Sequence, residues 1–105
     1  MADTKHEILT GLLVDDVTEV TIDDVTRYCA VRREMIVELV SEGIIEPVGR
    51  TPEEWRFTGR ALSRAGKAVR LARDLEINLH AVAVVLDLLD RIDTLHAALE
   101  RGRRG

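Results

Sequence analysis

Cysteine, aromatic residues and long apolar runs are scarce in this chain of 105 residues. The single cysteine, Cys29, excludes an internal disulfide and a multi-cysteine zinc site. Aromatic residues make up 3% of the chain, so its core must consist mainly of leucine, valine, isoleucine and alanine, which favours helices. The longest apolar run, residues 81–86, is far shorter than the stretch of about eighteen residues that a membrane-spanning helix needs. We therefore expect one helical domain without a membrane span.

Further absences narrow the functional classes. The N-terminus has no apolar stretch that ends in small residues, so no signal peptide is predicted and a cytoplasmic location is expected. The histidines are scattered, no serine has a neighbouring histidine and aspartate, and no glycine-rich phosphate loop occurs. We therefore predict that the chain is not an enzyme and holds no metal or cofactor.

Charge is unevenly distributed, although the net charge is only -4. Residues 59–73 contain five basic residues and no acid, whereas residues 74–100 contain six acids and one arginine. Three further arginines lie within the last five residues. Such alternation can steer a charged partner onto one face of the molecule, although it does not identify the partner.

Three segments are predicted along the chain. Residues 1–20 form an N-terminal extension for which a strand is expected, although a helical stripe of apolar residues over positions 8–14 fits nearly as well. Residues 21–77 form a winged helix-turn-helix. Residues 78–105 form a long C-terminal helix and a basic tail.

The middle segment carries clear local signals. Thr21, with acids in the following turn, predicts a helix over residues 22–30. A second apolar helical pattern follows, and Gly43 stands where a left-handed C-cap is needed. Two short helices joined by a tight turn make a helix-turn-helix. The β-prone runs 44–46 and 55–57 enclose a turn-rich loop and predict a small hairpin, the wing.

Two more helices are predicted after the wing. Thr58 is the expected N-cap of a basic amphipathic helix that stops near residues 74–77, and Asn78 is the expected cap of a helix over about residues 79–101. Apolar positions of the last helix recur at steps of three and four, which predicts a dimerisation seam. A homodimer is favoured over a helix that packs only on its own domain. The seam consists of Val82, Val85, Leu89, Ile92, His96 and Leu99.

The predicted fold is mostly α, and its order of elements resembles the MerR-type DNA-binding domain. MerR regulators usually present arginine and tyrosines just before the helix-end glycine, where this chain has residues 35–42 without either type. A closer resemblance, over about residues 17–100, is to the chaperone-modulator family CbpM. The matching pieces are Val25-x-x-Tyr28-Cys29, Glu38-Leu39-Val40 with Gly43-Ile44-Ile45-Glu46-Pro47, Trp55-x-Phe57, Ala68-Val69-Arg70-Leu71-x-x-Asp74-Leu75, Ala81-Val82-Ala83 and Leu88-Leu89-Asp90-x-Ile92-x-x-Leu95.

The CbpM resemblance implies a non-enzymatic protein that binds the J-domain of the co-chaperone CbpA and blocks its stimulation of the Hsp70 chaperone DnaK. J-domains carry a strongly basic second helix, so acidic side chains are the predicted binding residues. Glu34, Glu38 and Glu42 recur at every fourth position and form one stripe, and Asp87 and Asp90 supply a second candidate set. A solvated helix face without a partner is the alternative reading of the stripe.

The alternative function is a MerR-like DNA-binding transcriptional regulator. The five basic residues of the segment 59–73 are the best evidence for it, because phosphate neutralisation carries nucleic-acid binding. However, residues 31–43 and the wing, residues 44–58, each have a net charge of -1. Surfaces of that sign repel phosphate, so specific DNA binding is not expected.

Overall fold

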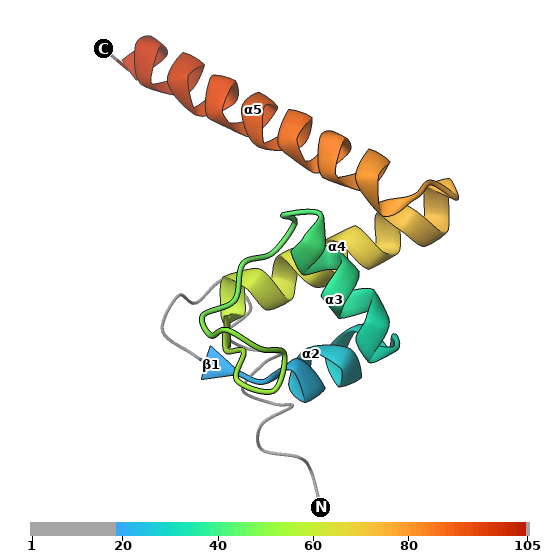
Figure 1. The fold of residues 1–105 in the computed structure, drawn as a ribbon. Coiled ribbons are helices and arrows are strands. Elements are labelled where there is room, and N and C mark those ends of the chain that lie inside the picture. Colours follow the sequence, from blue (N-terminus) through green and yellow to red (C-terminus); the bar gives the residue numbers. More distant parts are fainter. Residues whose placement is uncertain (1–18, 105) are drawn as a thin grey trace, which may run out of the picture.

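The computed structural model describes residues 19–104, which form four helices and one small sheet (Figure 1). The mostly α architecture predicted from the sequence is confirmed. Most of the expected N-terminal strand lies outside the described residues, and its last two residues form the first strand. In chain order the elements are β1 (Glu19–Val20), α2 (Ile22–Cys29), α3 (Arg33–Ser41), β2 (Phe57–Thr58), α4 (Gly59–Leu75) and α5 (Leu79–Arg104).

Three of the helices begin at the capping residues that the sequence indicates. The Thr21 hydroxyl accepts a hydrogen bond from the Asp24 backbone N–H at 3.2 Å, and the Asp24 carboxylate accepts one from the Thr21 N–H at 2.8 Å. This reciprocal capping box satisfies two backbone donors at the start of α2. Thr58 and Asn78 each accept a hydrogen bond from the backbone N–H three residues later, at 3.1 and 2.9 Å. The starts predicted at these three residues are confirmed.

Left-handed backbone conformations end three of the described helices, α2, α3 and α4. Gly43 has φ +73°, and the N–H groups of Gly43 and Ile44 donate to carbonyls of the last turn of α3 at 2.9 Å each. This is a Schellman motif, in which glycine avoids the strain of positive φ. Ala30 after α2 and Glu76 after α4 adopt the same region without being glycine, at φ 57° and 53°.

The wing is shorter than predicted. Val48 and Arg56 pair through two backbone hydrogen bonds of 3.0 and 2.9 Å, which closes the predicted hairpin loop. The run 44–46 is not a strand in the structure. Pro47 cannot donate to a ladder, and the Ile44 carbonyl accepts a hydrogen bond from a side chain of α4. Instead β2 pairs with β1, which comes from before α2, in an antiparallel register.

The core lies between α2, α3, α4 and the first turns of α5. Trp55 and Phe57 are 9% and 1% exposed and meet edge to face, with ring centroids 6.0 Å apart. Edge-to-face contacts of this kind add to the stabilisation from burial alone. The remaining buried apolar residues are Val20, Ile22, Val25, Ile36, Leu39, Ile44, Ile45, Leu62, Ala65, Ala68, Val69, Leu79, Val82 and Leu86.

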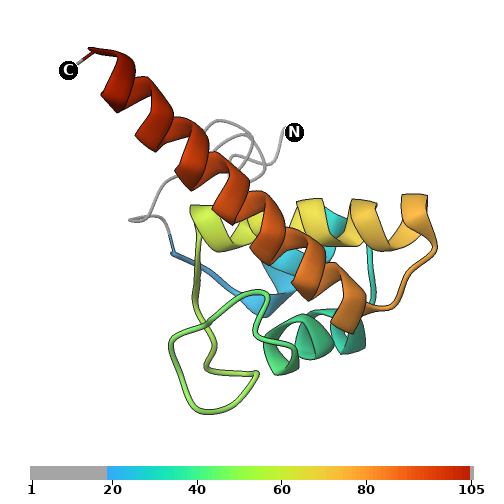
Figure 2. The same ribbon diagram turned by 90° about the horizontal axis from the view of Figure 1, so that it is seen from above.

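Helix α5 returns across α4, and its C-terminal half extends beyond the body of the molecule (Figures 1 and 2). Every residue from 91 to 104 is exposed. The described chain is accordingly elongated, with dimensions of 48 × 30 × 28 Å. Even so, no helix within residues 19–104 combines the length and the apolar content needed to cross a bilayer.

Candidate protein-binding site

The outer face of α3 presents an acidic stripe to solvent. Glu34, Glu38 and Glu42 are all exposed, while Ile36 and Leu39 on the other side of the helix are completely buried. Among the described residues, Glu34 and Glu38 make no side-chain hydrogen bond or ion pair. Their carboxylates are therefore available to a cationic partner.

The acidic stripe meets helix α5 at its C-terminal end. His80 Nδ1, in the first turn of α5, lies 3.1 Å from Glu42 Oε1, and in Figure 1 the C-terminal end of α3 points towards α5. Asp87 follows His80 by two helical turns and so lies on the same side of α5. We call the surface formed by Glu34, Glu38, Glu42 and Asp87 the acidic corner. Asp87 pairs with Arg91 of its own helix at 3.2 Å, so within the described residues Glu34 and Glu38 are the carboxylates of this corner without an ion pair.

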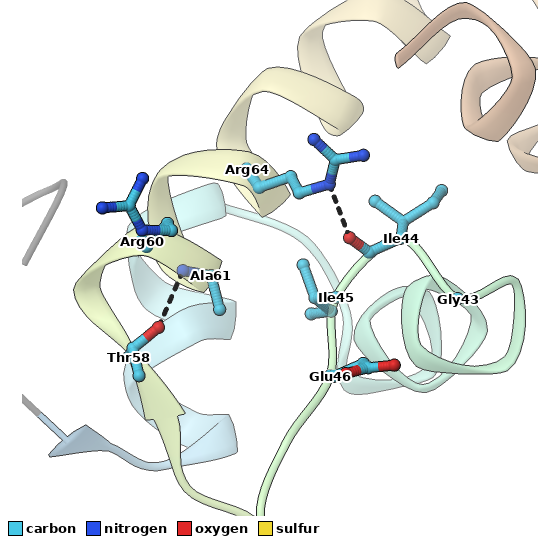
Figure 3. A pocket seen from close by; sticks show the side chains of 8 residues that line it. All are labelled: Gly43, Ile44, Ile45, Glu46, Thr58, Arg60, Ala61 and Arg64. Atoms are coloured by element: carbon cyan, nitrogen blue, oxygen red, sulfur yellow. Dashed lines mark hydrogen bonds between the residues drawn. The ribbon is translucent and has the colours of Figure 1, made fainter. Parts of the chain in front are cut away.

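Asp90, predicted as a partner-binding residue, is ion-paired within the chain. Its carboxylate pairs with the Arg64 guanidinium of α4 at 3.1 Å. The Arg64 Nε also donates to the Ile44 carbonyl at 2.8 Å (Figure 3). Arg64 thus ties the segment after α3 and the middle of α5 to α4. In the sequence Arg64 is one of five cations in the segment 59–73, and no local pattern distinguishes it from the others.

Electrostatics around the N-terminal end of α3 favour a cationic partner. Arg33 donates to the Glu53 carboxylate in the wing at 2.9 Å, so this arginine is neutralised within the molecule. The contact also holds the wing against α3. The charge offered by the exposed face of α3 is therefore dominated by its glutamates.

The six residues predicted for the dimerisation seam do not share one free face. Val82 is fully buried in the core of its own chain, and Leu89 packs against that core. Val85 is half-buried, whereas Ile92, His96 and Leu99 are exposed. The prediction that Val82 belongs to the dimerisation seam is wrong. Helix α5 has two apolar faces, and Val82 lies on the inner one, which covers the domain.

A second apolar stripe on α5 faces solvent, and we call it the α5 ridge. Its residues are between 47% and 66% exposed. Steps of four, four, three and four separate them, and the last four follow the alternation of a coiled coil. The ridge consists of Val84, Leu88, Ile92, Leu95 and Leu99.

The other chemically interesting side chain, Cys29, is a partly buried thiol. Burial raises the pKa of Cys29 to about 11, although the nearby Arg70 cation opposes the shift. A protonated thiol is a poor nucleophile and a poor metal ligand. Among residues 19–104, no cluster of histidine, cysteine and acidic side chains could hold a metal ion.

We expect Cys29 to react slowly with iodoacetamide in the folded chain. A pKa of about 11 leaves roughly 100-fold less thiolate at pH 8 than the ordinary pKa of 9.0 does. Labelling followed by mass spectrometry at pH 8 should therefore accelerate sharply when the chain is unfolded in guanidinium. Equal rates in the folded and unfolded chains would contradict the buried position of the thiol.

Comparison with known proteins agrees with this architecture. Residues 20–104 match the family model described as MerR HTH family regulatory protein. A "Chaperone modulatory protein CbpM" of Coxiella burnetii (strain Dugway 5J108-111) is 39% identical over 93 residues, which cover 89% of this chain and 88% of the relative. A protein of the same name from Pseudomonas putida (strain ATCC 700007 / DSM 6899 / JCM 31910 / BCRC 17059 / LMG 24140 / F1) is 40% identical over 74 residues, or 70% of this chain and 67% of the relative.

Both descriptions name regulatory or modulatory proteins rather than enzymes, in agreement with the prediction that this chain is not an enzyme. The family match spans both the helix-turn-helix and α5. By this match and by its 39% identity to a relative of which it covers 88%, the chain belongs to the CbpM chaperone modulatory proteins of the MerR helix-turn-helix family.

Proposed function

We propose that this chain acts in the cytoplasm as a modulator of a J-domain co-chaperone of the CbpA or DnaJ type. It binds the J-domain and inhibits stimulation of the Hsp70 chaperone DnaK. The observation that carries the proposal is the 39% identity to a chaperone modulatory protein over 89% of the chain. The acidic corner supports it independently, because it offers carboxylates to a basic helix.

The mechanism is occlusion by charge complementarity. The J-domain offers its basic second helix to DnaK, and carboxylates spaced one turn apart along α3 can pair with lysines and arginines on that helix. Exposed ion pairs contribute about 0.2–1 kcal/mol each, so they govern the association rate and orientation more than the whole affinity. Apolar contacts of the same interface supply the remainder. A J-domain held in this way is unable to dock on DnaK.

Titration with a purified J-domain tests the proposal. Calorimetry should show saturable binding to the wild-type chain, and the J-domain-stimulated ATPase rate of DnaK should fall as the chain is added. The basal ATPase rate of DnaK without the J-domain should stay unchanged. Absence of binding by the wild-type chain would remove the modulator function.

A DNA-binding regulator is the second candidate, and the basic outer face of α4 favours it. Helix α3, which would enter the DNA groove in a helix-turn-helix protein, argues against it, because α3 is rich in glutamate and its Arg33 is paired with Glu53. We therefore expect only weak binding that is independent of sequence and declines steeply with salt, as backbone contacts do. Selection from random duplexes at physiological salt measures this. Recovery of one tight palindromic operator would establish the regulator instead.

We also propose that the chain is a homodimer joined through the α5 ridge. Coiled-coil spacing and exposure on a long, otherwise unsupported helix support a second copy as the occupant. Charge complementarity supports an antiparallel arrangement. Asp87 lies in the N-terminal half of α5 and Asp93 lies near its middle, whereas three arginines lie in its last turn.

Substitution of Leu95, 63% exposed in one chain, tests the dimer. Leu95→Asp would place a carboxylate in an apolar interface, and light scattering should then report a mass near 11.8 kDa instead of about twice that value. Thr94→Asp is the control, because Thr94 is exposed but lies off the ridge. A wild-type monomer at tens of micromolar, or an unchanged Leu95→Asp dimer, would contradict the proposal.

A further inference from the structure

Helices α3 and α5 together form the acidic corner, although they share little direct packing. Helix α3 packs mainly against α2, whereas α5 packs mainly against α4. Polar side chains connect the C-terminal end of α3 to α5 at two places within the described residues. One is the contact between Glu42 and His80, and the other runs through Arg64 of α4. The placement of α3 relative to α5 therefore depends on α4 and on these two connections.

Arg64 is the more shielded of the two connections. Its side chain is 33% exposed, whereas that of His80 is 82% exposed. The Arg64 Nε donates to the carbonyl of the buried residue Ile44 at 2.8 Å (Figure 3). A buried carbonyl that loses its donor destabilises the fold more than the loss of an exposed polar pair does. Arg64 is accordingly the stronger link between the two acidic helices.

Both partners of Arg64 lie at points that control a helix. Ile44 closes the last turn of α3 through its own N–H, at 2.9 Å, so a hold on its carbonyl holds the end of that helix. Asp90 lies where α5 leaves the body of the molecule, because every later described residue of α5 is exposed. Arg64 Nη1 lies 3.1 and 3.5 Å from the two carboxylate oxygens of Asp90.

We propose that Arg64 is a positioning residue for the acidic corner, and that Asp90 acts through Arg64 instead of contacting the partner. This role rests on the proposed binding of a J-domain. A partner that pairs with the carboxylates of α3 also meets the adjoining side of α5, since Glu42 lies against His80 there. Helices that are fixed in advance spare the complex the cost of ordering them. Loss of Arg64 should therefore weaken binding without any contact between Arg64 and the J-domain.

Arg64→Met removes both polar contacts and keeps a side chain of similar width. It also makes the chain more negative, so long-range electrostatics alone would tighten the binding of a basic J-domain. Positioning predicts the opposite direction, a loss of affinity of about three- to tenfold in calorimetric titration. Arg70→Met is the matched control. It removes from α4 an exposed cation without an ion pair among the described residues, and the affinity should stay unchanged or rise.

Asp90→Asn separates positioning from direct contact. The Asp90 side chain is more than half exposed, so this variant should keep its fold even if Arg64→Met does not. In the wild-type background it should weaken J-domain binding about twofold to threefold, and in the Arg64→Met background it should cause no further loss. An Asp90 carboxylate that contacted the J-domain directly would give the same loss in both backgrounds.

Residual dipolar couplings of the 15N-labelled full chain measure the angle between α3 and α5 without a partner. Arg64→Met should change this angle or average the couplings of α5, whereas Arg70→Met should not. Unchanged or tighter J-domain binding by Arg64→Met, additive losses with Asp90→Asn, or unchanged couplings would each overturn the proposal. Failure of the wild-type chain to bind the J-domain would remove the modulator function, and the couplings would still decide whether Arg64 fixes the two helices.

Discussion

Replacement of Glu34 and Glu38 together by lysine is expected to weaken J-domain binding by about 10- to 100-fold. Each change removes an exposed attraction and introduces a repulsion against a basic helix. Both side chains are exposed, and among the described residues neither supports another part of the molecule. The fold and the oligomeric state should therefore persist, as circular dichroism and light scattering would show. Calorimetric titration of the J-domain measures the affinity.

Salt dependence gives a second readout of the same double variant. Wild-type affinity should fall as salt rises, and the residual affinity of the variant should be less sensitive to salt. The matched control is Glu54→Lys with Asp74→Lys, which makes the same total charge change at exposed residues outside the acidic corner. Equal affinities of wild type and the Glu34, Glu38 double variant would place the docking surface elsewhere.

Phe57→Ala is expected to lower the free energy of unfolding by about 3–5 kcal/mol. Phe57 is 1% exposed, contacts Trp55 edge to face, and belongs to β2, which pairs with β1. Its removal would leave a cavity where the sheet meets the helices. Small domains are stable by only about 5–15 kcal/mol, so this loss is a large fraction of the total. Urea denaturation followed by circular dichroism measures it.

Val48→Ala serves as the stability control for Phe57→Ala. Val48 also lies at the wing but is 74% exposed, so its truncation should change the free energy of unfolding by no more than about 0.5 kcal/mol. A similar loss in the two variants would mean that the wing as a whole, and not the buried ring, supports the domain.

Local structure was largely predictable, because its causes are close together in the sequence. The side chains of Thr21, Thr58 and Asn78 cap helices through backbone groups only three residues away. Gly43 likewise ends α3 through bonds within one turn. Signals of this range survive in any single sequence, and the starts of α2, α4 and α5 and the end of α3 follow from them.

Features that depend on distant partners were not predictable in the same way. The β-prone run that includes Trp55 and Phe57 was assigned to the wing. In the structure Phe57 pairs with Val20 of β1, and two helices separate these strands in the sequence. Periodicity predicted apolar faces on α5 but did not show which of the two covers the domain. Val82 was therefore assigned to the face that pairs with a second copy, whereas it is buried in its own chain. The acidic set of α3 was identified from its spacing, whereas its contact with α5, between Glu42 and His80, depends on the tertiary fold.

Ala30 and Glu76 occupy the two bends at which α2 turns into α3 and α4 turns into α5. A left-handed backbone costs a residue with a side chain about 1–2 kcal/mol, a cost that glycine would avoid. Glycine, however, would open many other backbone conformations to each bend. The chain thus gives up stability at both bends and restricts the angles between the joined helices. The proposed J-domain partner would accordingly meet carboxylates on helices held at fixed angles and not across a hinge.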